Sequence, residues 1–307
     1  MNILGKRYIF FAVSLLVIVP GLLVLAFGGL PLALDFTGGS LLEVSFPGAQ
    51  QPQPAEIIAL YNELGVKDTQ VQTTDAGSLV IRSTFLDDAT REQVLSALQE
   101  KFGSKPTMIR FDSVGPTIGA QVTSRAALAV AVAALVVVLY ITITFRGIAH
   151  AFRYGICAIL AMVHDVAVVF SVAGLGALFL GWEIDSLFLT ALLTVIGFSV
   201  QDKIVVFDRI RENSNILRRL NFETLVNHSV VQTLQRSINT QLMTVEFLLL
   251  ALALFGGVTL QEFSVLMLVG LFSGTYSSIF IAAPVLVVWE NKEWKNWFGR
   301  NKAESAA

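Results

Sequence analysis

Long apolar stretches recur along the chain and are separated by shorter polar segments. Six of them approach or exceed the ~20 residues that an α-helix needs to cross about 30 Å of hydrocarbon. The first is longer than a secretory signal and lacks a clear small-x-small cleavage site, so we expect it to be retained. The pattern predicts a polytopic α-helical membrane protein with six transmembrane helices, at residues 8–28, 126–145, 154–180, 187–207, 240–255 and 263–288.

The hydrophobic pattern changes between the first and second spans. Alternating positions predict strands there, and apolar positions three and four apart predict helices. The expected order is strand 41–46, helix 54–64, strands 71–73 and 79–83, a helix capped by Asp87 and Asp88, and strand 107–111. This β-α-β-β-α-β order predicts a small α+β ferredoxin-like domain. It contains no pattern typical of a metal, phosphate or nucleophile site, which favours a binding or mechanical role.

The basic residues between the spans predict the orientation of the chain. The net charge is only −2, but Lys and Arg concentrate in alternate short loops and at both termini. Such loops are typical of the cytoplasmic side. The loops at residues 181–186 and 256–262 contain Asp or Glu but no Lys or Arg. We therefore expect both termini in the cytoplasm and the α+β domain outside it.

This orientation divides the chain into four parts. They are an N-terminal segment with the first span (1–29), the extracytoplasmic domain (30–125), the other five spans (126–290) and a cytoplasmic tail (291–307). Apolar positions at helical spacing, opposed by polar ones, predict a cytoplasmic amphipathic helix near residues 221–236.

An acidic residue, Asp202, lies inside the fourth predicted span next to Lys203. A carboxylate at the centre of a span costs about 2.5–3.5 kcal/mol on insertion scales, so it is by default a functional-site hypothesis. Arg236, just before the fifth span, shares a helical face with other polar residues and is the cation expected to meet Asp202. A carboxylate whose cation moves can load and unload a proton. The alternative is a static buried ion pair that fixes helix register.

Other polar residues also lie within the predicted spans. His164 and Asp165 are in the middle of the third span, and Glu246 is deep in the fifth. Each could belong to a proton path, or could form hydrogen bonds that only fix helix packing. The sequence leaves both interpretations open.

Glycine residues mark two further features. Gly38 and Gly39 precede the α+β domain, and Gly115, Pro116 and Gly119 follow it, so both segments can hold a bend or act as a hinge. Ordinary turns are the alternative. In the last span, Gly270, Gly274 and Ser278 recur at four-residue spacing, which allows close helix packing.

Enzymatic functions find little support in the sequence. The lone cysteine, Cys157, has no partner for an intrachain disulfide, and the three histidines form no HExxH pair. Walker loops and Gly-x-Ser-x-Gly elbows are also missing from the sequence. An intramembrane aspartyl protease could use Asp165 and Asp202, but the residues around them match no protease signature. We expect a transport subunit without a resident cofactor.

Six motifs together resemble the SecF family, the smaller subunits of SecDF protein-export complexes. They are DFTGG at 35–39, VGPTIG at 114–119, His164-Asp165, GFSVQDKIVVFDRIREN at 197–213, QTLQR at 232–236 and GTYSSI at 274–279. The resemblance covers nearly the whole chain in order, and the run at 197–213 is highly specific. It places the chain in the proton-driven resistance, nodulation and division superfamily, where six-helix units work in pairs.

The resemblance implies a function, a location and partners. A SecF-type subunit lies in the bacterial cytoplasmic membrane and uses the proton motive force, or a sodium gradient, to promote preprotein export. The implied partners are SecD and the SecYEG channel, with SecA and YidC nearby, the preprotein and membrane lipids, but no nucleic acid. The proton-carrying aspartate of the family falls on Asp202 and its arginine on Arg236.

The chain departs from the family pattern beside this aspartate. Gln201 and Lys203 stand where the family usually has Asn and Thr or Ser, so an amide is displaced by one methylene and a charge is added. We expect Lys203 to extend toward the cytoplasmic headgroups, because it lies about a turn and a half from Arg209. Two alternative functions stay open: a passive scaffold of the Sec complex, and half of a proton-driven exporter of small molecules or lipids.

Overall fold

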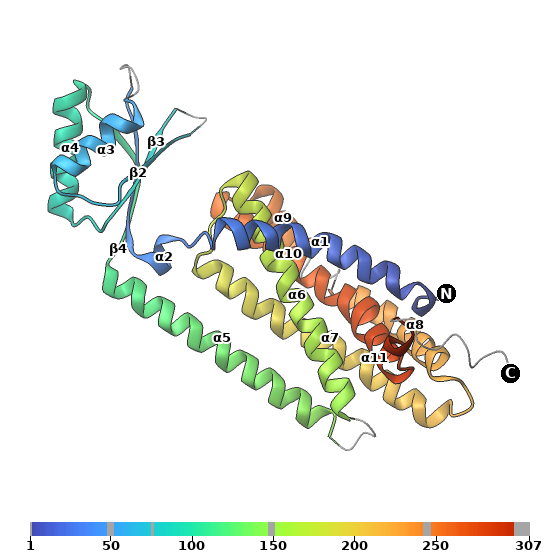
Figure 1. Cartoon of the computed structure of the whole chain (residues 1–307). Helices are drawn as coiled ribbons and strands as arrows, with labels where there is room; N and C mark the ends of the chain where they lie inside the picture. The colour runs from blue at the N-terminus through green and yellow to red at the C-terminus, as the bar shows by residue number, and fades with distance from the viewer. Residues whose placement is uncertain (1, 48–51, 75–76, 147–150, 242–246, 298–307) are drawn as a thin grey trace. The chain divides into compact units, whose positions relative to one another are not determined.

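The computed structural model describes residues 2–47, 52–74, 77–146, 151–241 and 247–297. It divides into two compact units, one of Met1–Pro31 with Val130–Ala307 and the other of Leu32–Ala129. The first unit is helical, and the second, here called the head, contains the sheet (Figure 1). Each unit is described separately below.

The head is built around a four-stranded antiparallel sheet. Its elements follow the order β1 (Gly39–Ser45), α3 (Pro54–Glu63), β2 (Gln70–Thr73), β3 (Leu79–Ser83), α4 (Asp88–Phe102) and β4 (Thr107–Val114), after a short helix α2 (Leu34–Thr37). The strands lie side by side in the order β2-β3-β1-β4. Both helices cover the same face of the sheet (Figure 1). This is the β-α-β-β-α-β order that the hydrophobic pattern predicts.

The head has its own hydrophobic core between the sheet and these helices. Alternate residues of β1 and β3, such as Leu42 and Ile81, point into it, and α3 and α4 contribute Ile57 and Leu98, all at most 1% exposed. The Asp87 side chain accepts a hydrogen bond from the Thr90 amide at 2.8 Å and so caps α4. The core therefore lies on one face of the sheet.

The glycine segments at the two borders of the head pack against each other. Gly38 and Gly39 adopt φ values of +70° and +117°, which other residues rarely adopt. A Cβ atom on Gly119 would lie 2.9 Å from the Gly38 amide nitrogen, and the Thr123 hydroxyl donates to the Phe36 carbonyl at 3.0 Å. The backbone conformation therefore requires glycine at Gly38 and Gly39, and the close approach of the two segments requires it at Gly119. Hinge motion at Gly38, Gly39, Gly115, Pro116 and Gly119 stays a prediction.

Five helices of the described chain are long and apolar enough to cross a membrane. They coincide with five of the predicted spans and cover Leu4–Gly28, Pro116–Thr144, Ala151–Leu180, Ser186–Ile216 and Leu260–Glu290. The corresponding elements are η1 (Leu4–Lys6) with α1 (Arg7–Gly28), α5 (Pro116–Thr144), α6 (Ala151–Leu180), α7 (Ser186–Ile216), and α10 (Val258–Ser277) continued by η3 (Ser278–Ala282) and α11 (Ala283–Glu290). The remaining predicted span, 240–255, includes residues 242–246. These residues, Glu246 among them, lie outside the described residues.

The helices on either side of that gap are α8 (Phe222–Gln241) and α9 (Phe247–Phe255), and a short α12 (Trp294–Trp297) ends the described chain. Helix α8 begins in the predicted amphipathic segment, and its apolar residues Leu225, Val226 and Val230 are buried. Arg7 at the start of α1 contacts Glu223 on α8 and Glu293 beyond α11, at 3.0 and 2.6 Å. These three helix ends therefore meet at one end of the helical unit (Figure 1).

Small residues let α1, α6, α7 and α10 approach closely. The Ser171 hydroxyl of α6 donates to the Val17 carbonyl of α1 at 2.7 Å, beside Gly21. A Cβ atom on Gly270 would lie 2.3 Å from Val195 Cγ2 of α7, and one on Gly274 would lie 3.3 Å from Ser199 Cα. Helices α6, α7 and α10 therefore form a tightly packed centre, which contains the buried polar side chains of Asp165, Ser199 and Lys203.

Candidate functional site

Helix α7 carries two buried ionisable residues in succession. Asp202 is 8% exposed and Lys203 is fully buried. Successive residues of an α-helix project about 100° apart, so the two side chains face different neighbours. Lys203 faces α6, whereas Asp202 faces α8 and η3. The site consequently has two centres, one on each side of α7.

The first centre is the carboxylate of Asp165 on α6. Lys203 Nζ donates to Asp165 Oδ2 at 2.7 Å, and both side chains are at most 1% exposed. The other groups around this carboxylate are His164 Nδ1 at 3.0 Å and the hydroxyls of Ser199, Ser273 and Ser277 at 2.6, 2.7 and 2.7 Å. We call this set of residues the Asp165 cluster. It joins α6, α7 and α10 through one buried carboxylate.

The second centre is the carboxylate of Asp202. The Ser237 hydroxyl of α8 donates to Oδ1 at 2.7 Å, and the Ser278 hydroxyl of η3 donates to Oδ2. Ser278 begins a π-helical segment, a feature that is frequent at functional sites. In the described residues no cation lies within ion-pair distance of Asp202. Its hydrogen-bond partners among the described residues are these two serine hydroxyls.

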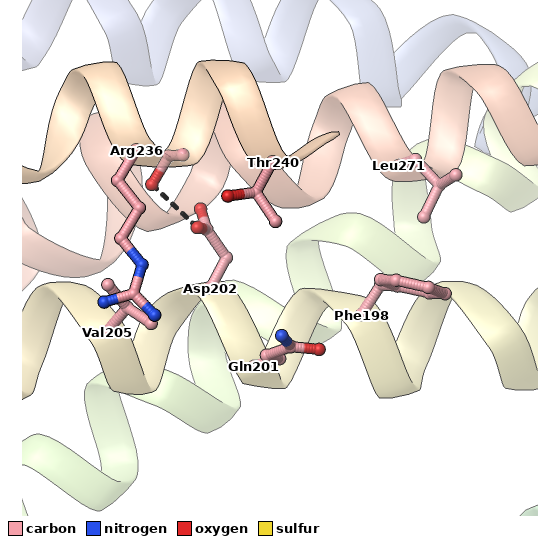
Figure 2. A pocket seen from close by; sticks show the side chains of 8 residues that line it. Phe198, Gln201, Asp202, Val205, Arg236, Thr240 and Leu271 are labelled. Carbon is pink, nitrogen blue, oxygen red and sulfur yellow. Dashed lines mark hydrogen bonds between the residues drawn. The ribbon is translucent and has the colours of Figure 1, made fainter. Parts of the chain in front are cut away.

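Asp202 borders a cavity of about 60 Å³, large enough for a water molecule. Phe198, Val205 and Leu271 supply its apolar lining, and the polar side chains around it include Gln201 and Arg236 (Figure 2). A second, more open cavity of about 370 Å³ is lined by Asp208, Arg209, Glu212 and Arg236. Arg236 lines both cavities, so it lies between the Asp202 carboxylate and a charged vestibule.

The predicted contact between Arg236 and Asp202 is not formed in this structure. In Figure 2 the Arg236 side chain extends past Val205, and the only dashed line to Asp202 comes from the residue next to Arg236 on α8. Within the described chain no hydrogen bond or ion pair joins the two side chains. Ser237, whose side chain is buried, takes the place expected for Arg236.

The prediction that Lys203 extends toward the headgroups is wrong. Its ammonium group is bound within the bundle by Asp165, by Ser199 Oγ at 2.5 Å and by the Ser199 carbonyl at 3.2 Å. Because Ser199 lies one turn before Lys203 on the same face of α7, the lysine stem folds back along the helix to reach α6. An ion pair with Asp165 compensates the charge that burial makes costly.

The Asp165 cluster accounts for the burial of the Asp165 carboxylate but not for the burial of the His164 ring. Asp165 makes hydrogen bonds to two neighbouring helices, which was one of its two interpretations. His164 Nδ1 is hydrogen-bonded to Asp165, whereas Nε2 is buried without a hydrogen-bond partner among the described residues. Gln201 is exposed on α7.

Sequence reasoning missed the serines that surround both carboxylates, apart from Ser277 and Ser278. The available signal was their spacing, because Ser199 with Lys203 and Ser273 with Ser277 are each four residues apart and so share a helix face. A group of three or more His, Cys, Asp or Glu side chains that could hold a metal ion does not occur in the described part of the chain. The chemistry that this arrangement offers is proton or cation binding by carboxylates.

Comparison with known proteins gives two matching family profiles. Residues 94–292 match the profile described as protein export membrane protein SecD/SecF, C-terminal. Residues 23–46, which include Gly38 and Gly39, match the SecD/SecF GG motif. Together the two matches cover the candidate site and the start of the head.

Full-length relatives share the same description. The chain is 63% identical over 307 residues to the protein translocase subunit SecF of Anaerolinea thermophila, covering 100% of both chains. It is 45% identical over 325 residues to that of Thermobaculum terrenum, covering 100% of this chain and 99% of the relative.

A solved structure shares the fold. The crystal structure of SecDF, a translocon-associated membrane protein from Thermus thermophilus, superposes with a TM-score of 0.76 at 32% identity. The match covers 95% of this chain and 39% of the solved chain. This chain thus spans less than half the length of the solved SecDF protein.

Proposed function

Because this chain belongs to the SecF family of protein translocase subunits, we propose that it uses the proton motive force to promote preprotein export through a SecYEG channel. In this proposal Asp202 carries the proton and Arg236 is the cation that exchanges with it. The subunit catalyses no covalent chemistry and needs no resident cofactor. Sodium is the alternative coupling ion.

The observation that carries the proposal is the environment of Asp202. Its carboxylate is buried within a membrane-spanning helix and has hydroxyl neighbours but no ion-pair partner among the described residues. An unpaired charge there is costly, so the arrangement suits a neutral, protonated Asp202. A neutral Asp202 also satisfies Ser278, because the acid can donate to the Ser278 hydroxyl while this hydroxyl donates to the Thr275 carbonyl at 2.8 Å.

The position of Arg236 supports a state in which the proton is loaded. Arg236 lines the same cavity as Asp202 and also the charged vestibule beyond it. When Asp202 releases its proton, the resulting carboxylate attracts the nearest mobile cation. Movement of Arg236 into the small cavity then closes the contact that the sequence predicts. Proton transfer and helix movement are coupled through α8.

Exposed polar side chains on α7 and α8 support the binding of a partner protein within the membrane. Gln201 and Arg236 are exposed when the chain stands alone, and polar groups in a span usually face the bundle or water. We assign this face to SecD, which completes a paired six-helix assembly. SecYEG, with SecA and YidC nearby, is the assembly with which the pair works.

The same proposal fixes the fold class and the topology. We propose that the head is a ferredoxin-like domain, which its sheet order and its β-α-β-β-α-β succession support. We place it outside the bacterial cytoplasmic membrane, with both termini in the cytoplasm and a sixth span over residues 240–255. The head contacts the emerging preprotein and is the part that moves.

Replacement of Asp202 by Asn tests this function. The variant chain is placed with SecD in inverted membrane vesicles from a strain depleted of its own SecF, and preprotein import is measured with and without an ionophore. We expect Asp202→Asn to assemble with SecD and to lose the ionophore-sensitive part of translocation. Glu100→Gln, which removes an exposed carboxylate on α4 of the head, is the control and keeps it. Unchanged ionophore-sensitive translocation in Asp202→Asn contradicts the proposed proton role.

One observation favours a passive scaffold as a second candidate. The Asp165 cluster ties α6, α7 and α10 together with a buried ion pair, which is also what a static structural role requires. For a scaffold, Asp202→Asn leaves translocation intact and loss of Asp165 dissociates the complex. The same vesicle assay therefore separates the two functions.

A further inference from the structure

His164 contains a buried nitrogen that the interactions described so far do not explain. Its Nδ1 lies 3.0 Å from Asp165 Oδ1. Because a carboxylate only accepts hydrogen bonds, Nδ1 carries the hydrogen, and in a neutral ring Nε2 then has a bare lone pair. This Nε2 is buried and has no hydrogen-bond partner among the described residues. A buried acceptor without a donor is costly and requires an explanation.

The surroundings of the ring leave that lone pair free. The His164 ring stacks on Tyr276 of α10 at 6.1 Å between centroids. The Tyr276 hydroxyl is engaged elsewhere, because it donates to the Phe10 carbonyl at 2.9 Å and accepts from Ser14 at 3.4 Å. The His164 side chain is 10% exposed. Nε2 is therefore a shielded basic site that can take up a proton only when the helices around it rearrange.

Two structural links connect this site to Asp202. On α7, Lys203 pairs with Asp165 and is adjacent in sequence to Asp202. On α10 and η3, Ser277 donates to Asp165 and the next residue, Ser278, is hydrogen-bonded to Asp202. A displacement of either segment acts on both carboxylates. Deprotonation of Asp202 therefore changes the surroundings of Asp165 and His164.

Charge balance gives the direction of this coupling. With Asp202 neutral, the buried charges of Asp165 and Lys203 cancel. When Asp202 loses its proton, one negative charge is left over inside the bundle until Arg236 moves into the small cavity beside it. Uptake of a proton at His164 Nε2 compensates it, while Nδ1–H stays on Asp165 and no bond between heavy atoms changes. Ionisable groups this closely linked titrate as one system.

We propose that His164 is a second proton-binding residue, coupled to Asp202 through Asp165 and Lys203. The proposal rests on the proposed ion-driven function. Among the described residues, the charged and titratable side chains that face the two sites are Asp165 on α6, Lys203 on α7, Arg236 on α8 and Tyr276 on α10. Helix α1 contributes the Ser14 hydroxyl and the Phe10 carbonyl through Tyr276. A pH change read at His164 therefore reports on this system.

The variant His164→Asn separates proton binding from structure. The Asn amide can still donate to Asp165 but cannot titrate. His228→Asn is the matched control, because His228 is exposed on α8 and bonds to Gln232. In vesicles containing SecD, we expect His164→Asn to assemble and to lose most of its ionophore-sensitive translocation. His228→Asn keeps wild-type translocation. Unchanged translocation in His164→Asn overturns the proposal.

A second measurement leaves His164 intact. The full chain is labelled with nitrogen-15 histidine, and the titration of His164 is followed by NMR in lipid for wild type and Asp202→Asn. We expect the midpoint to move by about 0.7 pH unit or more, the equivalent of a fivefold coupling. An unmoved midpoint, or a His164 that does not titrate, overturns the proposal even if Asp202→Asn abolishes translocation. A separate result contradicts the proposed function itself, namely wild-type translocation that the ionophore does not reduce.

Discussion

Removal of the Lys203 charge is expected to destabilise the helical unit strongly. The substitution Lys203→Met keeps the apolar stem and deletes the ammonium group that Asp165 contacts at 2.7 Å. Asp165 then becomes a buried carboxylate without a cation, and breaking a buried pair in this way costs about 3–5 kcal/mol. At about 2–4 °C per kcal/mol for domains of 150–250 residues, the melting temperature falls by about 6–20 °C.

Thermal unfolding in detergent, followed by tryptophan fluorescence, measures this loss. The double variant Asp165→Asn with Lys203→Met removes both charges, so it recovers most of the stability. Lys6→Met is the matched control, because Lys6 is exposed at the start of the same unit and its loss costs less than about 0.5 kcal/mol. A Lys203→Met protein that melts with the Lys6→Met control refutes the buried pair, and returns Lys203 to the headgroup position that sequence alone suggests.

Two further predictions concern packing and pH. A Cβ atom on Gly270 would lie 2.3 Å from Val195 Cγ2, so Gly270→Ala should lower the free energy of unfolding by about 1–3 kcal/mol. At Gly197 an added Cβ atom would meet no neighbouring atom within 4 Å, so the free energy of unfolding of Gly197→Ala should stay within about 1 kcal/mol of wild type. Equal melting temperatures for the two variants contradict the close contact at Gly270. Although burial opposes it, hydrogen bonds from Tyr8, Asn291 and Arg7 lower the pKa of Glu293. Because the folded-state pKa is lowered, ionised Glu293 stabilises the folded protein at pH values above the unfolded pKa of about 4.3. This stabilisation is lost as pH falls through the lower folded-state pKa, so the difference in melting temperature between wild type and Glu293→Gln should shrink on acidification. A difference that grows in acid contradicts this assignment.

Hydrophobic periodicity was sufficient to predict most of the fold. Five predicted spans coincide with long apolar helices because burial in lipid depends on composition within one segment. The helix at Ser186–Ile216 continues nine residues beyond its predicted end at residue 207. The charged residues there end the apolar pattern, but they do not interrupt backbone hydrogen bonding. Composition therefore locates a span better than it locates the end of its helix.

The partners of the buried charges could not be predicted from the sequence. Asp202 and Lys203 were identified as costly residues from their position in an apolar run, but adjacent residues on a helix face different neighbours. Whether Lys203 meets Asp165 or the headgroups depends on the rotation of α7 against α6, which is set by contacts between distant segments. The same applies to Ser237, which occupies the place expected for its neighbour Arg236.

The buried serines illustrate the same limit. A serine in a span often donates to its own helix, as Ser264 does to the Leu260 carbonyl at 2.5 Å. Ser199, Ser273 and Ser277 instead donate to Asp165 across helix interfaces. Their four-residue spacing indicates a shared face, but only the packed bundle identifies the carboxylate that they surround.

The central claim, that Asp202 carries the transported proton, is tested most directly by proton flux. The chain is reconstituted with SecD in liposomes that contain a pH-sensitive dye, and a pH step is applied with the membrane potential clamped. Our account predicts a flux for wild type and for Glu100→Gln, and a flux no larger than that of empty liposomes for Asp202→Asn. A wild-type flux that persists in Asp202→Asn contradicts it.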